Sequence, residues 1–241
     1  CYGSPQATTI TVLPSPSIDN VQDVVACNGD LSGVLSFSGT ATTFNWTNSN
    51  PSIGLAASGN GNLPVFTNTN TSSNPSLATI TVTPQTSQGA QACVGTPEIF
   101  TITVNPTPSM NPIGNQILCS QDQSQPVNFS GSASSYYWTN NNTSVGLPSF
   151  GNGSIPAFTA NNTTNNTAVS QIQVTPQYTN AGTTCYGAPE SFTFSVDPIP
   201  GIQYSQVGES ICTGTNSAAV VLSSQTPGVA YTWQILNPSP A

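Results

Sequence analysis

The sequence predicts an all-β chain built from tandem β-sandwich repeats. Residues 35–50, LSFSGTATTFNWTNSN, return at residues 127–142 as VNFSGSASSYYWTNNN. Trp46 and Trp138 are 138 − 46 = 92 positions apart, and most of the chain matches itself at that offset. Apolar residues alternate with polar ones before each Trp, which is the period of a half-buried β-strand. We therefore expect a core that contains Trp46, Trp138, Phe37, Phe129, Phe100 and Phe192.

The composition excludes several classes of function. The 241 residues include no Lys, Arg or His and eight Asp plus Glu, for a formal charge of −8. Nucleic-acid binding is not expected, because neutralising phosphates requires Lys or Arg. Direct membrane insertion is not expected either, because no run approaches the ~20 apolar residues of a span. The sequence shows no signal peptide, and we expect it to be an excerpt of a longer secreted protein.

The 92-residue period divides the chain into four parts. Residues 1–17 are expected to be the last strand of a preceding repeat, 18–108 and 109–200 two complete repeats, and 201–241 the first strands of a diverged following repeat. In the first complete repeat, strands are expected at 21–26, 33–38, 42–48, 63–67, 77–83 and 98–104, with Gly59-Asn60-Gly61 in a turn and Cys93 in a loop. Pro-x-Pro joints between repeats favour a rod.

The six cysteines predict disulfides and an oxidising compartment, because no His is present to complete a zinc site or to activate a Cys nucleophile. Two connectivities stay open. Bonds within repeats would be Cys27–Cys93 and Cys119–Cys185. Bonds between repeats would be Cys1–Cys27, Cys93–Cys119 and Cys185–Cys212. The short reach of a disulfide favours the pairs within repeats.

Catalysis is not expected, because the carboxylates have no Arg or His beside them in the sequence to orient or tune them. No cofactor is expected. Calcium is the one metal that the acidic loops could take, since it binds oxygen ligands alone, but the sequence has no Asp-x-Asp-x-Asp run. The tryptophans are expected inside, so Tyr137, on the opposite strand face, is the candidate for an exposed contact.

The repeat resembles a known type. The strings ILCSQDQSQPVNFSG, YYWTNNNTSVGL, GNGSIPAFTA and CYGAPESFTFSVDPIP are similar to PKD-like repeats of giant surface adhesins, which gliding bacteria export by type IX secretion. The resemblance covers residues 18–200 well and 201–241 loosely. The usual Gly-Asp-Gly after the Trp is replaced here by Thr-Asn-Ser-Asn and Thr-Asn-Asn-Asn, which weakens any metal role for that loop.

The resemblance implies tandem immunoglobulin-like sandwiches that form the stalk of an adhesin at the bacterial cell surface. That protein would act in surface attachment or gliding motility and would not be an enzyme. The implied partners are neighbouring repeats of the same chain, surface polysaccharide, and the secretion or motility machinery. The alternative is a carbohydrate-binding module array within a secreted enzyme. An exposed aromatic platform on a sandwich face would distinguish the second function from the first.

Overall fold

The structure is a computed structural model that describes residues 2–88, 91–205 and 208–234. The chain divides into two compact units. Unit 1 consists of Cys1–Ser109, Ser132–Ser134 and Gln177–Gly187. Unit 2 consists of Met110–Gly131, Ser135–Pro176 and Ala188–Ala241. Unit 1 therefore contains residues from both sequence repeats.

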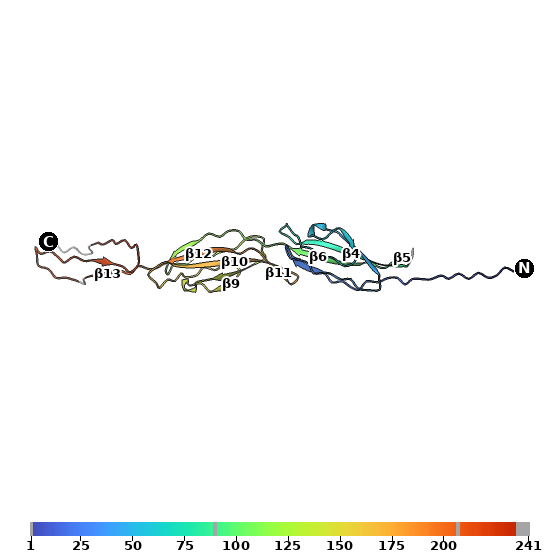
Figure 1. Ribbon diagram of the computed structural model, residues 1–241. Coiled ribbons are helices and arrows are strands. Elements are labelled where there is room, and N and C mark those ends of the chain that lie inside the picture. Colours follow the sequence, from blue (N-terminus) through green and yellow to red (C-terminus); the bar gives the residue numbers. More distant parts are fainter. Residues whose placement is uncertain (1, 89–90, 206–207, 235–241) are drawn as a thin grey trace. The chain divides into compact units, whose positions relative to one another are not determined.

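The main sheet of unit 1 has six strands: β1 (Val24–Cys27), β2 (Thr43–Asn48), β3 (Ser58–Asn60), β4 (Ser76–Gln88), β5 (Gln91–Val94) and β6 (Glu98–Asn105). Their order is β1-β6-β4-β2-β3, with β5 paired to β4, and β6 and β4 lie side by side (Figure 1). Strand β1 runs parallel to β6, whereas the other pairs are antiparallel. The all-β class expected from the alternation of apolar residues is confirmed.

The second layer of unit 1 is irregular, so the strands expected at 33–38 and 63–67 are wrong as regular strands. Isolated bridges join Leu31 to Thr67 and Leu35 to Leu63. Side chains supply hydrogen bonds that a ladder would otherwise make: Asn62 Oδ1 accepts from the Phe37 N–H at 3.0 Å, and Ser32 Oγ accepts from the Phe66 N–H at 2.9 Å. Pro64, which lies between Asn62 and Phe66 in the sequence, has no N–H to donate.

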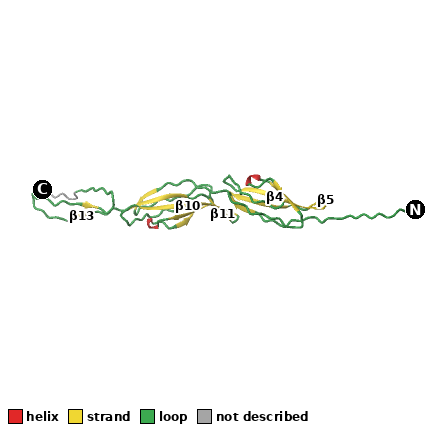
Figure 2. Cartoon of the chain, viewed as in Figure 1, coloured by secondary structure: helices red, strands yellow, loops and turns green. Residues whose placement is uncertain are grey.

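The strands of the second repeat reproduce those of the first at the 92-residue offset; for the first strand, 116 − 24 = 92. They are β7 (Gln116–Cys119), β8 (Ser135–Asn140), β9 (Phe150–Asn152), β10 (Ala168–Asn180), β11 (Thr183–Tyr186) and β12 (Glu190–Asp197), in the order β7-β12-β10-β8-β9 with β11 paired to β10. Two 3-10 helices, η1 (Pro51–Ile53) and η2 (Thr143–Val145), are the helical segments of the described chain (Figure 2).

Each unit has its own apolar core. Trp46 and Trp138 are each 4% exposed. Phe37 and Phe100 are buried in the core of unit 1, and Phe192 is buried in that of unit 2. The ring of Phe129 is half-buried at the margin of the second core. The inward positions of the alternating strands therefore build both cores.

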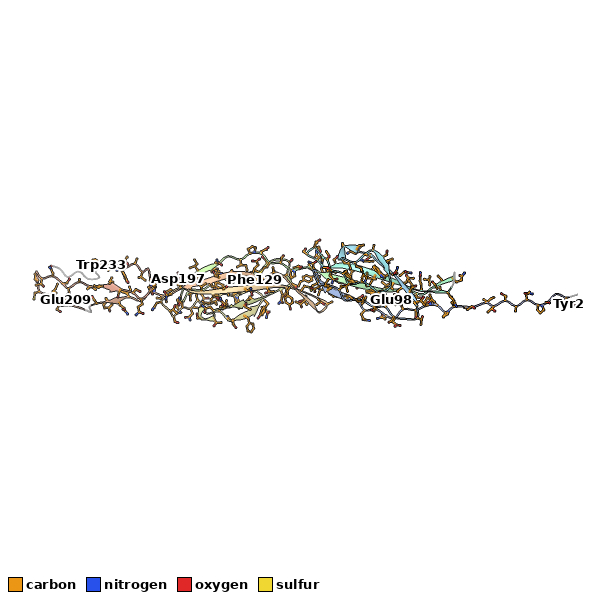
Figure 3. The ribbon with its side chains drawn as sticks, in the orientation of Figure 1. Tyr2, Glu98, Phe129, Asp197, Glu209 and Trp233 are labelled. Atoms are coloured by element: carbon orange, nitrogen blue, oxygen red, sulfur yellow. A yellow bond between two sulfur atoms is a disulfide. The ribbon has the colours of Figure 1, made fainter. Side chains whose placement is uncertain are left out.

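The outer parts of the chain contain little regular structure. Residues 2–17, where a strand was expected, form none, and Ile10 and Val12 are exposed. Beyond residue 200 the described chain has one short antiparallel pair, β13 (Gln203–Tyr204) with β14 (Leu222–Ser223). Trp233, aligned in sequence with the buried tryptophans, is 80% exposed (Figure 3). It lacks the strand that holds Trp46 and Trp138 in place.

Two local expectations are also corrected. Cys93 lies on strand β5 and not in a loop, because β4 extends to Gln88 and pairs with β5 along its last four residues. Gly59 lies in β3 opposite Trp46, and so does not belong to a turn. Gly61 does occupy the turn that follows, with a φ of 73° that favours glycine.

Candidate functional site: the disulfide between β1 and β11

A disulfide joins Cys27, the last residue of β1, to Cys185 in β11. Their Cα atoms are 5.6 Å apart, although the two residues are separated by 158 positions in the sequence. Both belong to unit 1, since β11 is part of that unit. Cys185 is 2% exposed, so the bond is shielded from solvent on that side.

The pairing expected within repeats is wrong for a geometric reason. Cys27 is in register with Asn105, at the end of β6 that pairs with the start of β4. Cys93 is in register with Thr86, near the other end of β4. About ten residues of strand between them span roughly 33 Å, whereas bonded cysteines need Cα atoms within about 7 Å. Cys119 is a free thiol, so its expected bond to Cys185 is wrong as well.

Polar contacts surround the bond between β1 and β11. The side chain of Asn105 is fully buried, and its Oδ1 accepts from Asn180 Nδ2 at 3.0 Å. The backbone N–H of Asn28 donates to the Asn105 carbonyl at 3.0 Å, and Asn28 Nδ2 donates to Thr107 Oγ1 at 2.9 Å. These contacts connect the end of β10, the end of β6 and the residue after Cys27. The cysteines are therefore held by a specific polar environment as well as by their own bond.

An apolar groove of about 280 Å³ lies beside Cys27. Its lining includes the buried Leu63 and Ile102, the exposed Leu31 and Val34, and Thr183 of β11. The groove opens between β1 and the irregular layer, where the sandwich has no regular strand to close it. It carries no cluster of groups that could perform chemistry.

Three other cysteines are free in the described structure. Cys93 is half-buried, and Cys119 and Cys212 are exposed. Cys1, which entered one of the two expected connectivities, lies outside the described residues. The between-repeat pairs Cys93–Cys119 and Cys185–Cys212 are therefore not formed either.

The carboxylates are spread over the structure and are used locally. Asp19 accepts from Ser38 Oγ at 2.7 Å, Glu98 from the Val21 N–H at 3.2 Å, and Asp122 from the Cys119 N–H at 3.1 Å. Within residues 2–88, 91–205 and 208–234, no three His, Cys, Asp or Glu gather in a way that could hold a metal ion. The absence of a cofactor stays a prediction, with calcium as the one metal that the acidic loops could take.

The aromatic residues separate into two groups. Trp46 and Trp138 lie in the cores, where their indole rings cannot stack on a sugar. Tyr137 is half-buried on β8, and its ring lies 6.4 Å from that of Phe150, which is 61% exposed. The corresponding positions in the first repeat are Asn45 and Ser58, so unit 1 has no such pair.

Buried asparagines are a structural feature that the sequence reasoning missed. Asn48 Nδ2 donates to the Leu55 carbonyl at 2.9 Å, and Asn70 Nδ2 donates to the Val104 carbonyl at 2.7 Å. Asn140 and Asn162 repeat both bonds in unit 2. The signal was present, since asparagine recurs at these positions at the 92-residue offset, but it was hidden among many other asparagines.

Comparison with known proteins finds similarity to solved structures alone. No protein-family model matches the sequence, and no curated protein matches it. Mouse Cadherin-23 repeats EC22-24 align over 89% of this chain and 79% of theirs, at 11% identity and a TM-score of 0.38. Mouse Protocadherin-24 EC1-3 aligns over 91% and 77%, at 11% identity and a TM-score of 0.43. Human CDH23 EC21-23 aligns over 89% and 81%, at 11% identity and a TM-score of 0.40.

These neighbours are extracellular cadherin repeats, but identity and structural agreement are too low to transfer a function from them. Among the described residues, no helix has the length and apolar character needed to cross a membrane. The functional argument therefore rests on the chain's own residues, and above all on the bond between Cys27 and Cys185.

Proposed function

We propose that this chain is a load-bearing structural segment of an extracellular adhesion protein, with residues 18–108 and 109–200 as its repeating units. The observation that carries the proposal is the Cys27–Cys185 disulfide. Such bonds persist in oxidising compartments outside the cytosol. A buried covalent link across 158 positions suits a chain that must resist extension.

The mechanical argument follows from covalent connectivity alone. Tension applied at the two ends of the chain passes along the residues before Cys27, through the disulfide, and along the residues after Cys185. The 157 intervening residues, 28–184, form a closed loop and carry no end-to-end load while the bond is intact. That loop contains Trp46 and Trp138, whereas Phe192 and Phe194 of the second core follow Cys185 and lie on the loaded path.

The finer assignment rests on the resemblance to PKD-like repeats. On that basis the chain is part of the stalk of a giant adhesin at a bacterial cell surface, exported by type IX secretion and acting in attachment or gliding motility. Its partners would be neighbouring repeats, surface polysaccharide, and the secretion or motility machinery. The stalk would hold an adhesive tip away from the cell, and the acidic surface would keep neighbouring stalks apart.

Single-molecule force spectroscopy on the 241-residue chain, pulled from its ends, tests the proposal. Reduction should release the closed loop and add roughly 520–570 Å of contour length, because each extended residue spans 3.3–3.6 Å. Cys27→Ser should give the long extension without reductant. Cys212→Ser, which removes an exposed free thiol, should leave the short extension unchanged. Equal contour lengths with and without reductant would overturn the proposed load path.

A second candidate function has one feature in its favour. The Tyr137–Phe150 pair offers an aromatic surface on β8 and β9, which is the type of surface that stacks on sugar rings. A glycan-array measurement on the whole chain, compared with Phe150→Ala, tests this candidate. Binding that disappears in Phe150→Ala would favour a carbohydrate-binding array, whereas no binding above background would remove this candidate.

A further inference from the structure

We propose that the apolar groove beside Cys27 binds an extended peptide segment of a partner protein, neutral or basic, which pairs through its backbone and inserts a leucine-sized side chain. Among the described strands, β1 pairs with β6 alone and so stands at the edge of its sheet. Edge strands present unpaired backbone groups, and addition of a strand is a common mode of peptide recognition. The equivalent region of unit 2 shows which chemical groups fill such a groove.

In unit 2, a side-chain amide closes the gap between β7 and the irregular layer. Gln116 Oε1 accepts from the Gln125 N–H at 3.0 Å, and Gln116 Nε2 donates to the Gln125 carbonyl at 3.1 Å. These are the two hydrogen bonds, one accepted and one donated, that the backbone of an adjacent strand would make with residue 125. The Gln116 amide therefore stands in for the peptide backbone of an added strand.

Unit 1 lacks this closure. The equivalent residues are Val24 and Gly33, since 116 − 92 = 24 and 125 − 92 = 33. The valine side chain has no group that can donate or accept a hydrogen bond. Within the part of the chain that the structure describes, the N–H and the carbonyl of the exposed Gly33 have no hydrogen-bond partner. Both groups are thus available to a peptide backbone at the point where unit 2 places the Gln116 amide.

The apolar interior of the groove arises from a second difference between the repeats. Leu118 on β7 packs against the core of unit 2. The equivalent residue on β1 is Ala26, since 118 − 92 = 26, and Ala26 lines the groove. Because alanine is much smaller than leucine, unit 1 has room here for an apolar side chain supplied from outside. The Leu118 side chain indicates the size and character of the side chain that would fill it.

The rim of the groove differs in the same direction. In unit 2, Gln123 Nε2 donates to Thr159 Oγ1 at 2.6 Å, so the rim is polar and its amide is paired. Leu31 holds the equivalent position in unit 1 and is 72% exposed. Val34, which also lines the groove, is 61% exposed. Covering these two side chains removes apolar surface from water, which favours an occupant with apolar side chains of its own.

Charge selects against an acidic occupant. The lining of the groove includes the carboxylate of Asp30. The sequence as a whole has no Lys, Arg or His to offset its eight Asp plus Glu. Like charges repel an acidic peptide both at a distance and in contact, whereas a basic residue beside the groove is attracted. An extended peptide with leucines at alternate positions and a lysine at one end meets all of these requirements.

The experiment titrates the folded, oxidised 241-residue chain with the synthetic peptide acetyl-Thr-Leu-Thr-Leu-Thr-Lys-amide by isothermal titration calorimetry. Ala26→Leu fills the groove and should weaken binding at least tenfold. Leu31→Gln changes an exposed side chain on the rim to the residue type of unit 2, so that folding is not at risk, and should weaken binding at least threefold. Leu77→Gln, an equally apolar and exposed position on β4 outside the groove, is the matched control and should have no effect.

Altered peptides separate strand pairing from simple adsorption of leucine side chains. A peptide that is N-methylated at every residue keeps its side chains but cannot donate backbone hydrogen bonds, and it should bind at least tenfold more weakly. A peptide with Glu in place of Lys should bind at least threefold more weakly.

Three results would overturn the proposal: no binding of the unmodified peptide, equal binding of the N-methylated peptide, or equal affinities of the Leu31→Gln and Leu77→Gln chains. Self-association of the chain alone that Ala26→Leu abolishes would assign the groove to a second copy and would overturn it as well. The load-bearing function does not depend on the outcome, because the force measurement concerns Cys27 and Cys185 alone.

Discussion

Trp46 on β2 lies directly opposite Gly59 on β3, and the indole ring covers the space where a glycine Cβ would be. Trp138 and Gly151 repeat this relationship in unit 2. Each tryptophan depends on a glycine across the sheet, because a larger side chain would overlap its ring. The Gly-Asn-Gly strings of the two repeats therefore serve the core as well as the turn.

Replacing Gly59 by alanine should destabilise unit 1 by about 1–3 kcal/mol, because the added methyl group forces the Trp46 ring out of its site. Gly151→Ala should have a similar effect in unit 2. Gly33→Ala is the matched control, since its added Cβ meets nothing within 4 Å. Urea unfolding followed by Trp fluorescence measures the change. Equal midpoints for Gly59→Ala and Gly33→Ala would contradict the packing relationship.

The acid sensitivity of unit 1 should depend on Asp23. The backbone N–H of Thr101 donates to Asp23 Oδ1 at 2.7 Å, and this bond lowers the pKa of the carboxyl below its usual value. A lowered pKa means that the stabilisation is present above the unfolded-state pKa of about 3.9 and is lost as pH falls through the folded-state pKa. Stability should therefore decrease as pH drops below about 4.

Asp23→Asn should keep the hydrogen bond and reduce the loss of stability in acid. Asn115, the equivalent residue of the second repeat, already accepts from the Thr193 N–H at 2.9 Å with a neutral amide. The converse change, Asn115→Asp, should make unit 2 more sensitive to acid. Urea midpoints measured between about pH 5 and pH 2 provide the comparison. An unchanged pH slope in Asp23→Asn would show that another group controls the transition.

The buried side chain of Asn70 should contribute more to the free energy of unfolding than the side chain of an exposed asparagine does. It donates to the carbonyls of Val104 and Asn74 at 2.7 and 2.8 Å and accepts from the Ser72 N–H at 2.9 Å. Asn70→Ala leaves these groups without partners and should cost about 2–4 kcal/mol in unfolding free energy. Asn20→Ala, at an exposed position, should change little. A loss in Asn70→Ala no larger than in Asn20→Ala would be evidence that water replaces the amide.

The alternation of apolar and polar residues predicted the strands of the main sheet well. The expected strand at 42–48 corresponds to β2, and that at 98–104 to β6, because inward apolar residues mark every second position. The end of β4, Gln85–Gln88, carries no apolar signal, so its extension and its pairing with β5 could not be seen. This extension of β4 determines where Cys93 lies, and the equivalent extension of β10 determines where Cys185 lies. For this reason spacing alone gave the wrong disulfide.

The irregular structure of the second layer could not be predicted from the sequence, and the reason is a different one. Residues 31–37 and 63–67 have strand-like sequences, but their hydrogen bonds come partly from Ser32 and Asn62 side chains. A polar residue that replaces a ladder partner looks in the sequence like an ordinary outward-facing position. The strands of the main sheet can therefore be predicted from periodicity, whereas the structure of the layer that lines the groove beside Cys27 cannot.

Peptide mapping without reductant tests the central claim most directly. The 241-residue chain is folded under oxidising conditions, its free thiols are alkylated, and it is cleaved by a protease that needs neither Lys nor Arg. The account predicts one dominant crosslinked species within the monomer, which joins the peptide of Cys27 to that of Cys185, with Cys93 and Cys119 alkylated. A monomer that contains Cys27–Cys93 and Cys119–Cys185 would contradict both the site and the load path derived from it.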